Sequence, residues 1–250
     1  MKKIGIVGGI AWTSTVDYYS GICRRCEQRQ QARKPGVLAH MPEIAIESLD
    51  LKTAFSYLGS DSDSQSWECF DEYQRTALRR LEAGGADFAV MAANSPHHRF
   101  DTITQGIKIP VINLLDVVAK AGSQVEAREI LILGTALAMR SSKFRDAFSK
   151  YGIHAAGPAG ETERAATVAL VTELQLGNLK DAADKVERIA RVCFGERQSA
   201  GRAVYLACTE LLLAFPDQKD SGTFQHRGIL YLNSTALHID AAFDFAMSGS

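Results

Sequence analysis

Short continuous apolar segments alternate with amphipathic helices along this chain, and this alternation limits its fold more than any other feature. A strand that is apolar at nearly every position is typical of a parallel sheet covered by helices on both faces. The alternation therefore predicts an α/β fold with parallel sheets. The expected strands are 2–7, 44–46, 87–92, 110–113, 129–135, 202–207 and 228–232.

The segments between these strands have the spacing of helices. Tyr18, Ile22 and Cys26 recur every four residues, as on one face of a helix that begins after a polar loop at 10–15. Ser14 or Thr15 is the expected N-cap of this helix. The expected helices are 16–33, 67–83, 114–121, 141–151, 161–176, 179–195 and 236–247. A polar segment at 59–66 is expected to be a mobile loop, and a lid over a site is one interpretation.

The two halves of the chain contain similar segments. The strand at Lys3–Gly8 resembles the one at Glu129–Gly134, and the strand end at 93–95 resembles the one at 208–210. Two strand ends of the same kind predict two similar lobes. We expect the first lobe to comprise 1–115 plus 216–250 and the second to comprise 116–215.

Composition excludes several classes of function. The 250 residues include 28 Lys and Arg against 29 Asp and Glu, so we expect no nucleic-acid partner, which would need a basic face. No apolar run approaches the roughly 20 residues that span a bilayer, so we expect no membrane partner. The two glycines at 8–9 interrupt the apolar start, which we interpret as a first strand and not a signal peptide. These features predict a cytoplasmic protein.

The five cysteines form an odd set, which favours reduced thiols over a disulfide framework. Cys23 and Cys26 form a C-x-x-C pair, but their amphipathic flanks place them on a helix. No second pair completes a zinc site, so no metal is expected.

One apolar segment, Arg202–Ala207, stops at Cys208, Thr209 and Glu210. In open α/β sheets ligands bind just beyond the carboxyl ends of the strands, so Cys208 is a candidate reactive thiol on a rigid support. The alternative interpretation is that Cys208 is a small core residue, because free cysteine packs as a hydrophobe.

Several segments, in the same order along the chain, resemble the aspartate/glutamate racemase superfamily. The resemblance is closest to bacterial L-aspartate/glutamate-specific or broad-specificity amino-acid racemases. The segments are Gly5–Thr15 with Tyr18 and Tyr19, Asn94–His97, Leu133–Thr135 with Met139 and Phe144, Ala207–Leu211, and His238.

This resemblance implies two pseudo-symmetric lobes with the active site in the cleft between them. It also implies a homodimer that needs neither pyridoxal phosphate nor metal and acts on an amino-acid or other small carboxylate substrate. Two residues on opposite faces of the substrate α-carbon exchange its proton, and Cys208 matches one of them. Thiols suit this role because their pKa is tunable. The matching substrate-binding residues are Asn94, Ser95, Thr135 and Thr209, and Trp12 either lines the pocket or packs as a hydrophobic lid.

The sequence departs from the family pattern at the position opposite Cys208. The family has cysteine or threonine there, and this chain has Ala93, which carries no exchangeable proton. The basic residue of the second lobe falls on Ala165, with Arg164 beside it, and the aspartate before the last helix is Asn233.

Three explanations of Ala93 remain open. The protein could use one thiol to protonate a single face, as related decarboxylases do. Ser95, His97 or His98 could replace the missing base, although the family keeps a histidine at the His97 position without using it as the base. An engineered substitution would give the same sequence. We therefore expect a racemase or epimerase first, a one-thiol lyase or decarboxylase second, and a degenerate carboxylate binder third.

Overall fold

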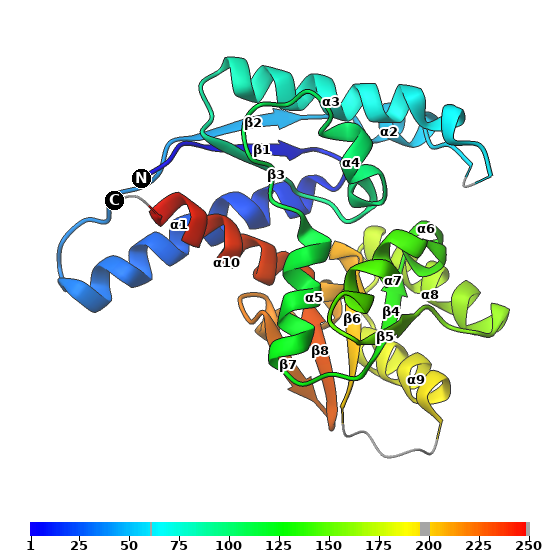
Figure 1. The fold of residues 1–250 in the computed structure, drawn as a ribbon. Helices are drawn as coiled ribbons and strands as arrows, with labels where there is room; N and C mark the ends of the chain where they lie inside the picture. The colour runs from blue at the N-terminus through cyan, green and yellow to red at the C-terminus, as the bar shows by residue number, and fades with distance from the viewer. Residues whose placement is uncertain (61, 196–200, 249–250) are drawn as a thin grey trace. The chain divides into compact units, whose positions relative to one another are not determined.

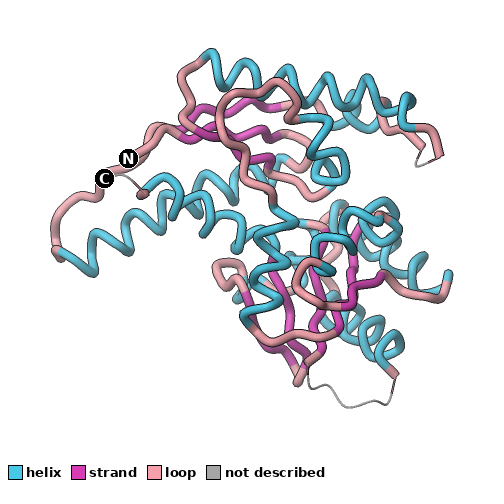
Figure 2. The backbone as a smooth tube through the Cα atoms, in the orientation of Figure 1, coloured by secondary structure: helices cyan, strands magenta, loops and turns pink. Residues whose placement is uncertain are grey.

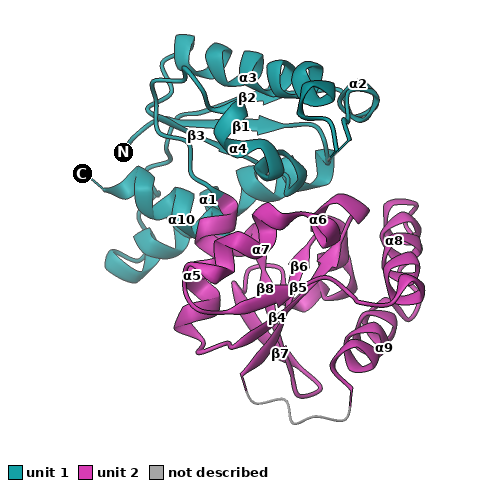
Figure 3. Ribbon diagram, turned by 45° about the vertical axis from the view of Figure 1, so that its right-hand side comes forward, with its two compact units in different colours: residues 1–113, 238–250 teal, residues 114–237 magenta. Residues whose placement is uncertain are grey.

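A computed structural model of the chain describes residues 1–60, 62–195 and 201–248. These residues form two compact units, Met1–Asn113 with His238–Ser250 and Leu114–Leu237 (Figure 3). The first boundary lies two residues before the expected one, and the return to unit 1 comes at 238 instead of 216. The return is later because residues 223–233 form two strands of the unit 2 sheet.

The sheet of unit 1 contains three parallel strands in the order β2-β1-β3 (Figure 1). They are β1 (Ile4–Gly8), β2 (Ile44–Ser48) and β3 (Phe88–Met91). The expected strand at 110–113 is reduced to one bridge between Ala89 and Val111. Pro110 has no N–H to donate, so this segment pairs with Ala89 only through the Pro110 carbonyl and the Ile112 N–H.

Helices cover the sheet of unit 1. Residues of α1 (Trp12–Arg33) and of α10 (Ser234–Met247) share a hydrophobic cluster with β1 and β3. The helix α3 (Glu68–Ala83) contacts all three strands. The shorter elements are α2 (Leu51–Ser56), η1 (Ser64–Trp67), η2 (Ser95–Arg99) and α4 (Phe100–Ile103).

Two local expectations for unit 1 need correction. The first helix begins at Trp12 and not at 16, and its N-cap, Ala11, makes no side-chain capping bond. Ser14 and Thr15 therefore lie inside the helix, where their hydroxyls serve other partners. The described part of the 59–66 segment ends in η1, and the Trp67 Nε1–H donates to the Ser60 carbonyl at 3.0 Å. Residue 61 lies outside the described residues.

Unit 2 contains a five-stranded sheet in the order β5-β4-β6-β8-β7. The strands are β4 (Glu129–Gly134), β5 (His154–Ala156), β6 (Arg202–Ala207), β7 (Thr223–His226) and β8 (Ile229–Asn233). All neighbours pair in parallel except β7 and β8, which are antiparallel. The expected parallel sheet is thus confirmed for the inner strands. The sequence analysis missed β5 and β7, which are short and lie at the two edges.

Helices pack on both faces of the unit 2 sheet (Figure 2). Residues of α5 (Leu114–Gln124) and α7 (Ser142–Ser149) belong to one core cluster, and residues of α8 (Glu161–Gln175) and α9 (Ala182–Phe194) belong to another. The strand β6 contributes to both, with Tyr205 in the first and Val204 in the second. The short helices are α6 (Ala136–Arg140), η3 (Thr209–Ala214) and η4 (Pro216–Gln218).

The cysteine and membrane predictions concern the whole chain. All five cysteines are free, and Cys23 and Cys26 lie on α1 as expected. Among the described residues, no group of three or more His, Cys, Asp or Glu side chains is arranged to hold a metal ion. The described helices include none with the length and hydropathy needed to cross a membrane.

A buried histidine joins three elements of unit 1. The His238 side chain lies on α10 with no exposed surface. Its Nε2 lies 3.1 Å from the Ile112 carbonyl, which can only accept, so Nε2 carries the proton. The Tyr18 hydroxyl of α1 then donates to Nδ1 at 2.7 Å. The pKa of His238 is lowered to about 3, chiefly by burial and also by the neighbouring His97, although the hydrogen bond to the Ile112 carbonyl raises it.

This histidine predicts a pH dependence of stability. The unfolded chain takes up a proton at His238 below pH about 6.5, while the folded chain does not until pH about 3. The stability is therefore complete above pH 6.5 and decreases as the pH falls toward 3. From pH 7.5 to 5 this group alone removes about 2 kcal/mol, because the loss approaches 1.36 kcal/mol per pH unit below pH 6.5.

Urea unfolding at pH 7.5, 6.5 and 5 measures this effect. His238→Gln should flatten the dependence between pH 6.5 and 5, because glutamine does not titrate there. His154→Gln changes an exposed histidine on β5 and should leave it unchanged. An equally steep loss in His238→Gln would contradict the assignment.

Candidate functional site

The strands β4 and β6 end beside each other in unit 2. Their register pairs Gly134 with Ala207, so Thr135 and Cys208 are the next residues on two neighbouring strands. A Cβ at position 134 would lie 2.7 Å from the Ala207 carbonyl oxygen, which explains the glycine in Gly134-Thr135. The Thr135 hydroxyl oxygen accepts a hydrogen bond from the Ala138 N–H at 3.2 Å and caps α6. The structure therefore brings together two sequence-predicted residues.

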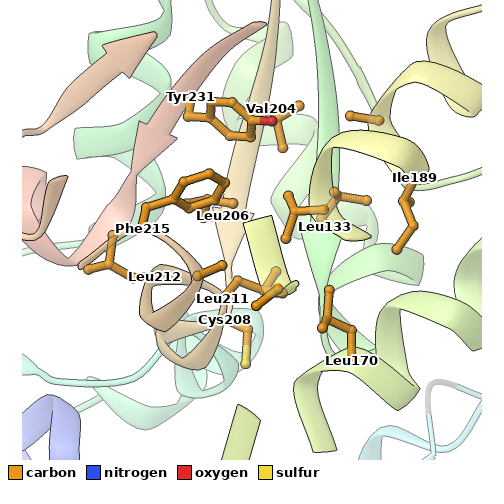
Figure 4. Packing of buried hydrophobic residues seen from close by; sticks show 14 of the residues in the cluster. Leu133, Leu170, Ile189, Val204, Leu206, Cys208, Leu211, Leu212, Phe215 and Tyr231 are labelled. Carbon is orange, nitrogen blue, oxygen red and sulfur yellow. The ribbon is translucent and has the colours of Figure 1, made fainter. Parts of the chain in front are cut away.

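Cys208 combines the two interpretations that the sequence left open. Its side chain is 6% exposed and belongs to the core cluster that includes Leu170 and Leu211 (Figure 4). It is also the residue before η3, where β6 gives way to a tight turn. The Cys208 Sγ–H donates to Glu210 Oε2 at 2.9 Å. Cys208 is thus a packed residue that holds a polar partner at a strand end.

Glu210 accepts hydrogen bonds from three side chains. Besides Cys208, the Thr209 hydroxyl donates to Oε2 at 3.0 Å. The Gln175 amide, from the end of α8, donates to Oε1 at 3.3 Å. The sequence analysis missed Gln175, which lies 35 residues from Glu210 and belongs to no motif. These contacts fix the carboxylate against the thiol.

The surroundings of Cys208 favour its protonated form. Burial raises the pKa of the thiol well above its ordinary value of 9.0, because a thiolate loses its hydration there. The negative charge of Glu210 raises the pKa further, and so does the hydrogen bond that the thiol donates to it. At neutral pH Cys208 therefore holds its proton. It is ready to act as an acid, and it becomes a base only when its proton leaves.

Unit 1 has a corresponding strand end after β3. Ala93 and Asn94 are buried there, and Ser95 is half-buried. The Ser14 hydroxyl donates to the Ala92 carbonyl at 2.7 Å. The Gly9 N–H donates to the Thr15 hydroxyl at 2.9 Å, which fixes the turn after β1. Ser14 therefore positions this strand end and Thr15 positions the turn after β1, roles that the N-cap expectation did not include.

The two histidines after Ala93 have different surroundings. His97 is 1% exposed, and its Nε2–H donates to the Met91 carbonyl at 3.3 Å. Its ring packs against Phe100 and His238. His98 is partly exposed, and its ring contacts Trp67. The contacts of His97 favour a positioning role.

Three other residues that the sequence singled out have local structural roles or exposed side chains. Trp12 is the first residue of α1, and its side chain is 70% exposed. Arg164 donates to the carbonyls of Pro158 and Ala159 at 2.7 and 3.0 Å, so its guanidinium holds the segment before α8. Asn233 accepts from the Ala236 N–H at 3.1 Å and donates to the Gln218 and Lys219 carbonyls, both at 3.2 Å.

Comparison with known proteins adds an independent finding. A family model described as Asp/Glu/Hydantoin racemase matches residues 7–242. The structure is similar to that of an aspartate racemase homologue from Pyrococcus horikoshii OT3, with 27% identity, a TM-score of 0.75, and coverage of 99% of this chain and 100% of that chain. A candidate Asp/Glu racemase from Yersinia pestis has 25% identity and a TM-score of 0.78, with coverage of 99% and 100%.

A more distant structure shares the fold. The glutamate racemase of Campylobacter jejuni subsp. jejuni has 16% identity and a TM-score of 0.64, covering 97% of this chain and 85% of that chain. The expected α/β fold of parallel sheets flanked by helices is therefore confirmed.

The contact between Cys208 and Glu210 generates a testable prediction. Glu210→Gln keeps an acceptor oxygen but removes the negative charge, so the pKa of Cys208 should fall relative to the unchanged chain. The thiolate absorbance at 240 nm, titrated against Cys208→Ala as the blank, measures this pKa. Glu161→Gln removes an exposed carboxylate elsewhere in unit 2 and should leave the Cys208 titration in place. A Cys208 pKa that stays constant or rises in Glu210→Gln would contradict the assigned electrostatic role.

Proposed function

Because this chain belongs to the Asp/Glu/hydantoin racemase family, we propose that it is an amino-acid racemase or epimerase that exchanges the α-proton through Cys208 without a cofactor. Family membership itself supports a racemase or epimerase function. The observation that carries the finer proposal is the thiol of Cys208 at the end of β6, hydrogen-bonded to Glu210. A thiol with a carboxylate partner has both the proton and the acceptor that acid–base catalysis needs.

The proposed chemistry starts with the proton of Cys208. Glu210 takes that proton and leaves a thiolate, which then removes the α-proton of the substrate. In the reverse direction the protonated Cys208 delivers its proton to the α-carbanion. The carboxylate of the substrate gains negative charge when the α-proton leaves, so it needs donors aimed at it. The proposal assigns this role to Thr135, Thr209, Asn94 and Ser95.

The second proton needs another group, because Ala93 carries none. Among the nearby candidates, His97 is enclosed and donates to a backbone carbonyl. Ser95 is half-buried and follows Asn94 directly. We therefore assign Ser95 as the group that replaces the missing acid/base and His97 as a residue that positions the strand end.

The substrate we propose is an amino acid with a neutral or apolar side chain. A second carboxylate would need a cationic partner when buried. Arg164, the basic residue beside the family position at Ala165, already donates to two backbone carbonyls. The names of similar structures refer to aspartate and glutamate, which are the competing substrates to test.

A one-thiol lyase is the second candidate function, and Ala93 is the observation that favours it. Loss of carbon dioxide from a substituted malonate breaks the carbon–carbon bond and leaves the electron pair on carbon. A single proton from Cys208 then completes the reaction, and the raised pKa of this thiol keeps that proton available. A small-carboxylate binder without turnover is the third candidate.

We further propose that the protein is a homodimer, whichever of these functions it has. The molar mass from sedimentation velocity tests this proposal.

Exchange of the α-proton for deuterium tests the racemase proposal. Single enantiomers of the common amino acids, incubated with the protein in deuterated water, should include at least one that gains α-deuterium. Cys208→Ala should lower the exchange rate at least a hundredfold, since a positioned acid–base group contributes about 10²–10⁴. Cys69→Ala removes an exposed cysteine of α3 and serves as the matched control.

The outcomes separate the candidate functions. Absence of exchange for every amino acid with folded protein excludes proton abstraction. Carbon dioxide release from substituted malonates that depends on Cys208 would then support the lyase. Full activity in Cys208→Ala excludes both enzymes. Thermal stabilisation by a carboxylate without turnover supports the binder, because a ligand of the native state raises apparent stability.

Position 93 provides a second prediction. Ala93→Thr introduces a hydroxyl where the family carries an acid/base, so racemisation should become at least tenfold faster. Ala93→Val has nearly the same shape without an exchangeable proton and should give no gain. Polarimetry or chiral chromatography measures the rate. Equal rates in the two variants would show that this position supplies no proton to the reaction.

A further inference from the structure

A cavity of about 400 Å³ lies in unit 1 between the last turns of α1 and α10, and we call it the basic pocket. Its lining includes one face of α1 and one face of α10. Its lining residues are Cys26, Arg29, Gln30 and Arg33 of α1, Phe243 and Met247 of α10, and Met1 and His40.

The basic pocket is separate from the strand end at Ala93. Ser14, which bonds the Ala92 carbonyl, and Arg33 lie near opposite ends of α1. At about 1.5 Å per residue, 19 residues of helix place them roughly 28 Å apart along its axis. The pocket therefore does not belong to the site proposed above.

The two arginines of the pocket have no acidic partner among the described residues. Arg29 and Arg33 lie on one cavity beside the imidazole of His40, and their described surroundings hold no carboxylate within ion-pair distance of either guanidinium. Arg29 instead lies over the ring of Phe243, with 5.9 Å between its guanidinium carbon and the ring centroid. By contrast, Arg25 of the same helix pairs with Asp240 of α10.

A second cavity of unit 1 shows that arginines lining a cavity of this protein can have acidic partners. The cavity beside α3 also holds two arginines, Arg75 and Arg80. Arg75 pairs with Glu72, and Arg80 pairs with Glu47 at 3.4 Å. The positive charge there is balanced within the chain. The basic pocket has an excess of positive charge that a bound anion would balance.

The rest of the lining limits the shape of the ligand. Phe243, Met247 and the buried Cys26 give the pocket an apolar part, and Gln30 adds an amide that donates and accepts. Guanidinium groups match carboxylate and phosphate oxygens through paired N–H donors. We propose that the basic pocket binds a small organic anion, a carboxylate or a phosphate monoester attached to an aromatic or short aliphatic body. This inference does not depend on the proposed racemase function.

Isothermal titration with phenyl phosphate tests the basic pocket. The unchanged protein should bind phenyl phosphate, and the dissociation constant should increase as the sodium chloride concentration is raised from 20 to 200 mM. Arg29→Gln/Arg33→Gln should bind at least tenfold more weakly. Lys52→Gln/Lys120→Gln removes two exposed positive charges outside the pocket and should bind within twofold of the unchanged protein. Arg33→Gln alone, at an exposed position, provides the test if the double variant is unstable.

Three further probes distinguish the parts of the ligand. Benzoate and inorganic phosphate should each bind to the pocket. Inorganic phosphate should bind more weakly than phenyl phosphate. Benzyl alcohol, which has no anionic group, should not bind. If benzyl alcohol bound as tightly as phenyl phosphate, the apolar residues alone would account for binding, and the proposal would be overturned. Absence of phenyl phosphate binding at 10 mM, or equal binding by the arginine and lysine double variants, would also overturn it.

Discussion

The hydrogen bond from the buried Cys208 thiol to the Glu210 carboxylate determines what the end of β6 can do. Burial and the nearby negative charge both raise the pKa of the thiol, so the proton stays on sulfur. The carboxylate is itself held by Thr209 and by Gln175 of another helix. A thiol held against a fixed acceptor can pass on its proton without large rearrangement, and acid–base catalysis needs donor and acceptor within hydrogen-bond reach in this way.

Each unit uses a buried serine to secure a strand end. Ser14, in the first turn of α1, donates to the Ala92 carbonyl at 2.7 Å. Ser234, the first residue of α10, donates to the Leu206 carbonyl at 2.9 Å. In both cases the acceptor lies within two residues of the position that the family resemblance assigns to proton transfer. The similarity between the two halves of the sequence thus extends to a shared way of holding the backbone at a strand end, with a serine hydroxyl bonded to a carbonyl at or next to the last residues of the strand.

The sequence predicted the elements that are buried on both faces. Expected and observed bounds of β1, β4 and β6 agree within two residues, because continuous apolar runs allow few alternatives. The edge strands β5 and β7 have partly exposed positions and no such pattern. The expected return to unit 1 at 216 came too early because β7 and β8 both belong to the unit 2 sheet. Cys208 and Thr135 were found from local motifs. Gln175 could not be found, because only folding brings α8 to Glu210.

Ala93 makes the two halves chemically unequal, and the state of Cys208 sharpens that inequality. A racemase with two thiols needs one of them deprotonated at the start of each turnover. Here the only thiol that the family resemblance assigns is buried and holds its proton, and its carboxylate partner, Glu210, is a neighbour on the same segment. In the proposed mechanism, proton delivery by Cys208 needs no second group, whereas proton removal needs Glu210 to accept the thiol proton. Racemisation requires both steps, with a separate group for the opposite face, whereas a lyase requires delivery alone. The proposed racemisation thus depends on Ser95, the group that we assign to the opposite face in place of Ala93, whereas the lyase reaction does not use it.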